Sequence, residues 1–161
     1  MIASAEFRRV LGHFASGVTI VTTCDGDRRP TGLTASAFSS VSLEPPLVLV
    51  CIDHKSQSHG PLVEGGRFAV NILSVEQQPL SRKFATTRLD KFDGVEYRLS
   101  DLGLPIIAAA IAHLECVTVS THVAGDHTIL VGRVEGAAAL DGGEPLLYFR
   151  GQYDRLRGGQ G

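Results

Sequence analysis

Short runs of β-branched and other apolar residues, separated by turn residues, follow one another along most of the chain. They predict strands over residues 18–23, 32–38, 47–52, 68–73, 112–122, 128–140 and 146–148. Asp25-Gly26-Asp27 is typical of a hairpin turn, and the segment 124–127 of a second hairpin tip. Because these strands do not alternate with helices, the pattern argues against a parallel βαβ fold and favours an antiparallel barrel.

Helical periodicity is limited to a few places. Four apolar residues at i, i+3, i+4 and i+7 predict an amphipathic helix over about residues 4–14: Phe7, Val10, Leu11 and Phe14. Ser4 is a candidate N-cap, and Gly17 lies just beyond the end. A second helix is predicted over 75–85 and a short helical piece near 61–64. Residues 86–103 are polar and irregular, and this segment is longer than a loop that only connects two elements usually is.

The composition sets limits on the class of protein. A chain of 161 residues with 43% hydrophobic and 20% charged residues predicts one globular domain over residues 1–161. The net charge of −2 argues against nucleic-acid binding, and the longest nearly uncharged run, 102–114, is too short to span a membrane. Charged residues among the first nine argue against a signal peptide. Three cysteines without close spacing predict neither disulfides nor a zinc site, and favour the cytoplasm.

A segment rich in hydroxyl side chains begins just before the strand predicted over 32–38 and ends before the strand predicted over 47–52. Its hydroxyl residues are Thr31, Thr34, Ser36, Ser39, Ser40 and Ser42. A second polar loop, residues 54–60, follows the next strand. Hydroxyls and free backbone N–H groups suit a phosphate and a polyol chain, although an ordinary strand end and turn explains the same residues equally well. We expect a phosphorylated ligand across these strand ends.

An ordered set of motifs extends this expectation. GVTIVTT (17–23), GLTASAFSSVSLEPPLVLVCI (32–52), FAVNILS (68–74), KFAT (83–86), DKFDG (90–94), GDHTILVGRV (125–134) and PLLYFRGQY (145–153) occur in the order found in the short flavin reductases. Over about residues 7–153 the chain resembles this family, the NAD(P)H-dependent components of two-component flavin monooxygenases. Each motif alone is weak, and the ordered set is specific.

The resemblance implies a mainly β fold, an antiparallel Greek-key split barrel of the FMN-binding type with a few short flanking helices. It implies FMN or FAD as flavin, NADH or NADPH as hydride donor, and a homodimer. The resemblance further implies that a hydride passes from nicotinamide C4 to flavin N5 and that the reduced flavin supplies a separate oxygenase. A flavin-binding redox sensor or carrier on the same barrel is the alternative from another class. An oxidase of pyridoxine phosphate or a deazaflavin enzyme is a third possibility, against which the Gly125-Asp126-His127 tripeptide and the 34–46 spacing argue.

The resemblance also implies which residues form the site. Ser56 would hold the cofactor phosphate, and His127 would position the nicotinamide, with a proton-donor role as a further option because free histidine titrates near pH ~6.5. The remaining implied cofactor-binding residues are Thr34, Ala35, Ser36, Ser39, Ser40, Val41, Cys51, Ile52, Asp53, Arg82, Lys83, Phe84, Ala85, Phe92, Tyr148 and Tyr153.

Several of these residues also have simpler interpretations. His127 at a hairpin tip fits an exposed turn residue, Arg82 and Lys83 suit a helix C-terminus, and Tyr148 and Tyr153 fit a strand with aromatic side chains. Cys51 has no neighbouring base in the sequence, so we expect a small buried residue rather than a nucleophile. The histidines at 54 and 59 lack a third ligand, which argues against a metal site.

Overall fold

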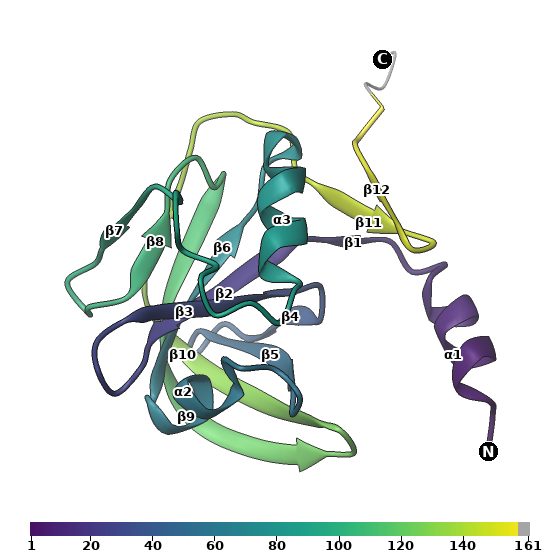
Figure 1. Cartoon of the computed structure of the whole chain (residues 1–161), viewed down its shortest axis with the longest axis horizontal. Coiled ribbons are helices and arrows are strands. Elements are labelled where there is room, and N and C mark those ends of the chain that lie inside the picture. Colours follow the sequence, from purple (N-terminus) through teal and green to yellow (C-terminus); the bar gives the residue numbers. More distant parts are fainter. Residues whose placement is uncertain (158–161) are drawn as a thin grey trace.

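The computed structural model describes residues 1–157 and is built mainly from β-strands (Figure 1). Its main element is a seven-stranded antiparallel sheet in the order β3-β2-β6-β9-β10-β5-β4. The strands are β2 (Thr19–Cys24), β3 (Pro30–Ala35), β4 (Phe38–Ser42), β5 (Leu47–Asp53), β6 (Arg67–Ile72), β9 (Ala112–Ala124) and β10 (His127–Ala139). A three-stranded sheet contains β1 (Ser16–Gly17), β11 (Leu147–Phe149) and β12 (Gln152–Asp154), and a third sheet pairs β7 (Tyr97–Leu99) with β8 (Pro105–Ile107).

The two edges of the main sheet lie close together. Strands β3 and β4 are its opposite edges, yet only Ser36 and Ala37 connect them. Three Cα–Cα steps span at most about 11 Å, so the sheet must curl until its edges approach each other. The N–H of Cys51 in β5 donates to the carbonyl of Ala37 at 3.0 Å, which holds this corner next to the end of β5.

Four short helical segments accompany the sheets: α1 (Ser4–Leu11), α2 (His59–Glu64), the 3₁₀ turn η1 (Val75–Gln77) and α3 (Gln78–Phe84). Helix α1 stands away from the body and buries none of its residues (Figure 1). It ends at Leu11, earlier than the predicted 14, because Gly12 follows as its C-cap. The predicted cap at Ser4 is wrong: Ala3 is the N-cap, and Ser4 is the first helical residue.

The core lies between the curled sheet and the helices. Val21, Val50, Ile52, Phe68 and Leu130 have no exposed surface and pack together inside the sheet. A second cluster under α3 joins Ile20, Leu73 and Phe84 with Leu146 from the C-terminal part. The buried positions alternate along β5 and the first half of β10, whereas β2 and β6 are buried on both faces.

Several predicted boundaries differ from the structure. The hydroxyl-rich residues 39–42, expected in a loop, belong to edge strand β4, because their backbone pairs with β5. The strand expected over 32–38 is interrupted at 36–37, where the chain passes from one sheet edge to the other. Strand β7 lies inside the segment predicted to be irregular, and β12 was not predicted. Among residues 1–157, no helix is long and apolar enough to cross a membrane.

Candidate active site

The end of β3 lies beside α3. The hydroxyl of Thr34 donates to the carbonyl of Ser81 at 2.6 Å, which holds this strand against the helix. Ala35 is buried and Ser36 is exposed, so the strand leaves the core at the β3–β4 corner. The predicted segment 34–36 therefore lies between the C-terminal half of α3 and the end of β5.

The loop after β5 is folded by its own side chains. Asp53 accepts the Lys55 N–H on its carboxylate at 2.8 Å and the Ser56 N–H on its carbonyl at 3.0 Å. Ser58 donates to the carbonyl of Gly32 at 2.9 Å, and its hydroxyl is 2.7 Å from that of Thr31. These contacts attach the loop to β3, the strand that also carries Thr34.

The 54–58 loop retains free donors. The Ser56 hydroxyl accepts the Ser58 N–H at 3.2 Å and, within residues 1–157, donates to no protein acceptor. In the same described range, the Gln57 N–H has no backbone acceptor and the Lys55 ammonium forms no ion pair. A free hydroxyl, a free N–H and a free cation suit a phosphate group, because an anion needs donors and positive charge.

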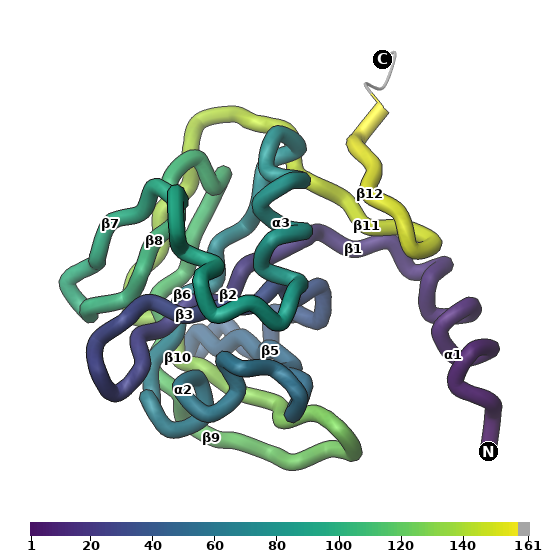
Figure 2. Tube along the Cα trace, in the orientation of Figure 1, coloured from purple at the N-terminus to yellow at the C-terminus, as the bar shows by residue number. Residues whose placement is uncertain are grey.

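The hairpin between β9 and β10 lies next to this loop (Figure 2). Gly125 has φ of 65°, which lets two residues turn the chain. His127 pairs in register with Asp53, and the His54 N–H donates to the carbonyl of Asp126 at 3.0 Å. The structure therefore brings the predicted phosphate loop and the Gly-Asp-His tip together.

His127 is held by its neighbour in the turn. Its Nδ1 lies 2.7 Å from the Asp126 carboxylate, and 41% of its side chain is exposed. The hydrogen bond from His127 lowers the pKa of the Asp126 carboxyl. Asp126 therefore stays ionised at neutral pH, and it fixes Nδ1 while leaving Nε2 of His127 available to a ligand.

Two of the aromatic residues predicted at the site, Phe84 and Phe92, pack into the core. The side chain of Phe84 is fully buried and packs against Phe92 with ring centroids 5.0 Å apart. Lys91 is also buried and donates to the carbonyls of Gly32 and Phe84 at 3.1 and 3.2 Å. Burial lowers the pKa of the Lys91 ammonium. Only the backbone of Phe84 remains for a ligand, so its predicted role applies to the main chain.

The cations and tyrosines near α3 form a second group. Arg82 lies over the ring of Tyr153 at 5.6 Å, and the Lys83 ammonium donates to the carbonyl of Asp93. Tyr148 and Tyr153 pack edge-to-face with centroids 5.5 Å apart. Ala85, the C-cap of α3, is exposed. Arg82 forms no ion pair with any described acidic residue, so its charge is free for a ligand at this side of β3.

The predicted site residues on β4 and those near the end of β5 differ in how far they are exposed. Ser39, Ser40 and Val41 are exposed on β4, which runs from the β3–β4 corner back along β5. Their contact with a ligand stays a prediction. Cys51 is half-buried and Ile52 is buried. Burial raises the pKa of the Cys51 thiol, which keeps it protonated at neutral pH and fits the expected small residue rather than a nucleophile.

One group was missed by sequence reasoning. His54 and His59 both place Nε2 near the hydroxyl of Thr128, at 3.1 and 2.9 Å. Thr128 is indistinguishable in the sequence from other β-branched strand residues, so no pattern could have identified it. Within residues 1–157, no group of three or more His, Cys, Asp or Glu side chains is arranged to hold a metal ion.

The fold and the geometry of the site already indicate a class of protein. A curled antiparallel sheet, a donor-rich loop fixed to a strand and a histidine-bearing hairpin tip meet here, and this arrangement suits a phosphorylated cofactor with a second ligand beside it. This arrangement is that of a β-sheet protein that binds nucleotide cofactors.

Comparison with known proteins identifies the family to which this chain belongs. The model of the flavin reductase like domain matches residues 11–157. The reductase subunit HsaB of a flavin-dependent monooxygenase from Rhodococcus jostii is 44% identical, over 92% of this chain and 75% of the relative. An NADH-dependent flavin reductase from a Rhodococcus species is 41% identical over 96% and 88%. The solved NADH:FAD oxidoreductase SgcE6 of Streptomyces globisporus, in complex with NAD and FAD fragments, has a TM-score of 0.92 and 39% identity, covering 98% and 94%.

The chain therefore belongs to the flavin reductase family, as its motifs predicted.

Proposed function

We propose that this chain reduces FMN or FAD with NADH or NADPH and releases the reduced flavin to a separate monooxygenase. The observation that carries the proposal is the contact between the donor-rich 54–58 loop and the Gly-Asp-His tip. Relatives whose names include NADH-dependent flavin reduction and a monooxygenase reductase subunit support it.

Each part of the site has a task in this reaction. Ser56 and Lys55 hold the flavin phosphate, segment 34–36 lies along the ring edge, and Arg82 provides charge on the helix side. His127, fixed through Nδ1 by Asp126, orients the nicotinamide. The bound flavin supplies N5 as the acceptor of a hydride from nicotinamide C4. The protein contributes orientation and excludes competing reactions, so it needs no acid–base dyad.

We further propose that the curled sheet forms a split barrel and that residues 1–161 belong to one domain. The three cysteines are free in the structure and fit a reducing compartment such as the cytoplasm.

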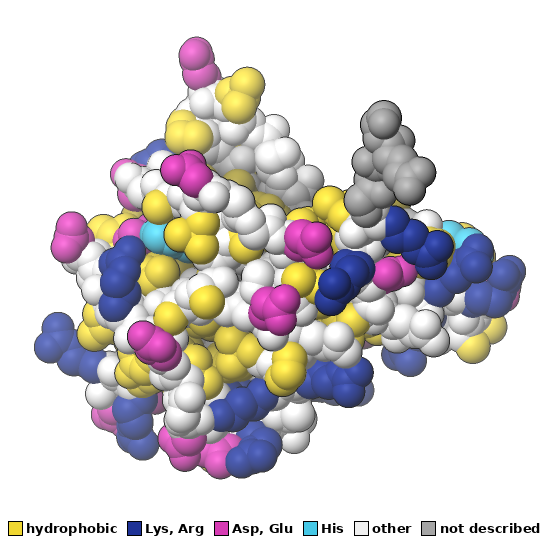
Figure 3. Space-filling view, turned by 90° about the horizontal axis from the view of Figure 1, so that it is seen from above, with side chains coloured by type: hydrophobic (Ala, Val, Ile, Leu, Met, Phe, Trp, Pro, Cys, Tyr) yellow, Lys and Arg dark blue, Asp and Glu magenta, His cyan; other side chains and the backbone are white. Residues whose placement is uncertain are grey.

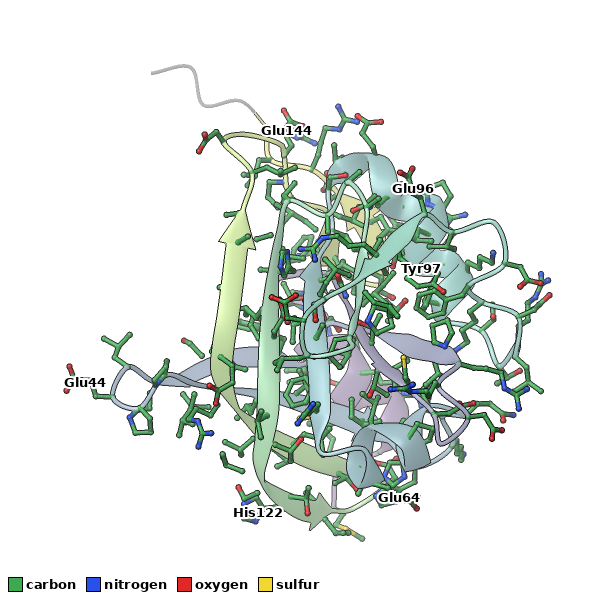
Figure 4. All side chains as sticks on the ribbon, turned by 90° about the vertical axis from the view of Figure 1, so that its left-hand side faces the viewer. Glu44, Glu64, Glu96, Tyr97, His122 and Glu144 are labelled. Carbon is green, nitrogen blue, oxygen red and sulfur yellow. The ribbon has the colours of Figure 1, made fainter. Side chains whose placement is uncertain are left out.

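A homodimer is part of the same proposal. The large apolar residues of α1 and the turn after it are exposed by about half or more: Phe7 51%, Val10 49%, Leu11 54% and Phe14 83%. A hollow of about 560 Å³ separates α1 from the turn at Arg150 and Gly151, and Lys and Arg side chains gather at this end of the molecule (Figure 3). The β4–β5 turn, marked by Glu44, also projects from the body (Figure 4), with Leu43 90% exposed. A second copy would cover these apolar surfaces.

Light scattering tests the homodimer. We expect a particle of twice the 17.1 kDa chain mass at micromolar concentration. The Phe14→Glu substitution should shift it toward the monomer, because a charge would then lie in the apolar contact. Leu140→Glu is the control, since Leu140 is 60% exposed outside this stripe. A monomer in the unsubstituted protein contradicts the homodimer.

Turnover with added flavin tests the main proposal and separates it from the carrier alternative. A reductase oxidises NADH or NADPH slowly until FMN or FAD is added, and then in proportion to the flavin supplied. A flavin carrier or sensor binds flavin without such turnover. A rate that does not change with added flavin contradicts the reductase function.

A further inference from the structure

Thr128 occupies a position between the two ligand-binding segments. It follows His127 directly in β10, it is only 3% exposed, and it pairs in register with Ile52 of β5. Its hydroxyl is 3.1 Å from Nε2 of His54 and 2.9 Å from Nε2 of His59. The two imidazole rings pack edge-to-face with centroids 5.0 Å apart.

The chemistry of this cluster restricts both rings. A threonine hydroxyl has one proton to donate and two lone pairs to accept with. It can donate to one Nε2 and accept an N–H from the other, or accept an N–H from both rings. One buried hydroxyl therefore fixes the orientation of two side chains.

These two histidines delimit the predicted phosphate loop. His54 is the first residue after β5, and His59 is the first residue of α2. The loop between them carries Ser56, whose carbonyl accepts the His59 N–H at 3.1 Å. Fixing both rings on β10 therefore fixes the two ends of the loop. Thr128 is also adjacent to His127 in the chain, so the loop and the hairpin tip are both attached at Thr128.

We propose that Thr128 is a positioning residue that couples the flavin-phosphate loop to the nicotinamide-binding tip through its hydrogen bonds to His54 and His59. It contacts neither ligand. It holds the loop in its phosphate-binding conformation and keeps the start of β10, including His127, in place beside it. This inference rests on the proposed function, because it takes the loop and the tip as the two ligand sites.

The Thr128→Val substitution tests the coupling, because valine keeps the shape and removes the hydroxyl. We measure dissociation constants for FMN and for riboflavin, which lacks the phosphate, and the KM for NADH. The dissociation constant for FMN should rise roughly tenfold, since about one hydrogen bond that orders the loop is lost. Riboflavin should change less than about twofold. The KM for NADH should rise with either flavin. The Thr128→Ser variant keeps the hydroxyl, so its dissociation constants for FMN and riboflavin and its KM for NADH should equal those of the unsubstituted protein.

Two further variants make the result specific. His59→Phe keeps a ring but removes Nε2, and it should weaken FMN selectively in the same way. Thr23→Val is the matched control: Thr23 is also 3% exposed, and its hydroxyl donates to the carbonyl of Arg67 in β6 rather than to a residue of the loop or the tip. It should leave both flavin affinities and the KM unchanged.

The outcomes separate the coupling from the function on which it rests. Equal weakening of FMN and riboflavin, a change at only one of the two sites, or failure of Thr128→Ser to restore binding overturns the coupling. If Ser56→Ala weakens FMN while Thr128→Val does not, the phosphate loop stands and the coupling is wrong. If Ser56→Ala leaves FMN binding unchanged, the phosphate loop is wrong and the coupling is overturned with it.

Discussion

The phenol of Tyr153 lies 2.7 Å from the hydroxyl of Ser81, which links the C-terminal strand β12 to helix α3. Ser81 is fully buried, and its carbonyl accepts the Thr34 hydroxyl at 2.6 Å. A continuous set of hydrogen bonds therefore runs from the C-terminal sheet through α3 to the strand end at which we place the flavin ring. The C-terminal segment thus supports the site without needing to contact a ligand.

Replacing Tyr153 with Phe should lower the free energy of unfolding by about 1 kcal/mol, because the buried Ser81 hydroxyl loses its partner. The matched control is Tyr148→Phe, since Tyr148 is 38% exposed and its phenol has no hydrogen bond among the described residues. Urea denaturation measures both variants. A loss of equal size in the two variants would show that the bond to Ser81 does not contribute.

Replacing Ser56 with Ala should weaken flavin binding by about 10- to 150-fold, since a hydrogen bond to a charged group contributes about 1.5–3 kcal/mol. Replacing His127 with Ala should instead raise the KM for the nicotinamide donor, lower turnover, or both, and leave flavin affinity nearly unchanged. Fluorescence titration and steady-state kinetics measure the two effects. If the His127 variant lost flavin and kept its donor kinetics, the two sites would be wrongly divided.

Replacing Gly132 with Ala should destabilise the fold by about 1–3 kcal/mol, because the core at this point is already full. A Cβ there would lie 2.5 Å from Cζ of Phe68 and 2.9 Å from Cβ of Cys116. Gly136 in the same strand is the control, because the nearest atom to its Cβ would be a Glu115 carboxylate oxygen at 3.5 Å. Thermal unfolding should show a clear loss for the first variant and little change for the second. Similar melting temperatures would contradict tight packing of Phe68 on β10.

Much of the fold follows from local patterns in the sequence. The β-branched run before Asp25 and the Gly125-Asp126 turn predict the hairpins correctly, because strand propensity and turn chemistry act between neighbouring residues. The break at Ser36 and Ala37 is not predictable in this way. These residues have no turn signature, and they change direction only because the curled sheet brings its two edges together.

Candidate site residues can be proposed from the sequence where residue type and position agree, and they are missed where tertiary contacts decide. Ser56 and His127 lie at strand ends, where polar side chains are unusual enough to draw attention. Phe84 and Thr128 show the limit: the first is buried by helix packing, and the second meets two histidines from a separate loop. Which neighbour a side chain meets across the sheet is set by register, which a single sequence does not display.

The three cysteines should differ in alkylation by iodoacetamide, because only a thiolate reacts. Burial raises the pKa of Cys116 to about 12, and it also raises the pKa values of Cys24 and Cys51. At pH ~8, near the ordinary pKa of a free thiol, Cys116 should therefore stay unmodified. Cys24 and Cys51, which are half-buried, should react more slowly than a free thiol and faster as the pH rises. Saturating FMN should protect Cys51, which lies at the proposed ring edge, and leave Cys24 unchanged as the internal control. Peptide mass spectrometry with and without FMN measures all three sites, and equal protection of Cys24 and Cys51 would place the flavin elsewhere.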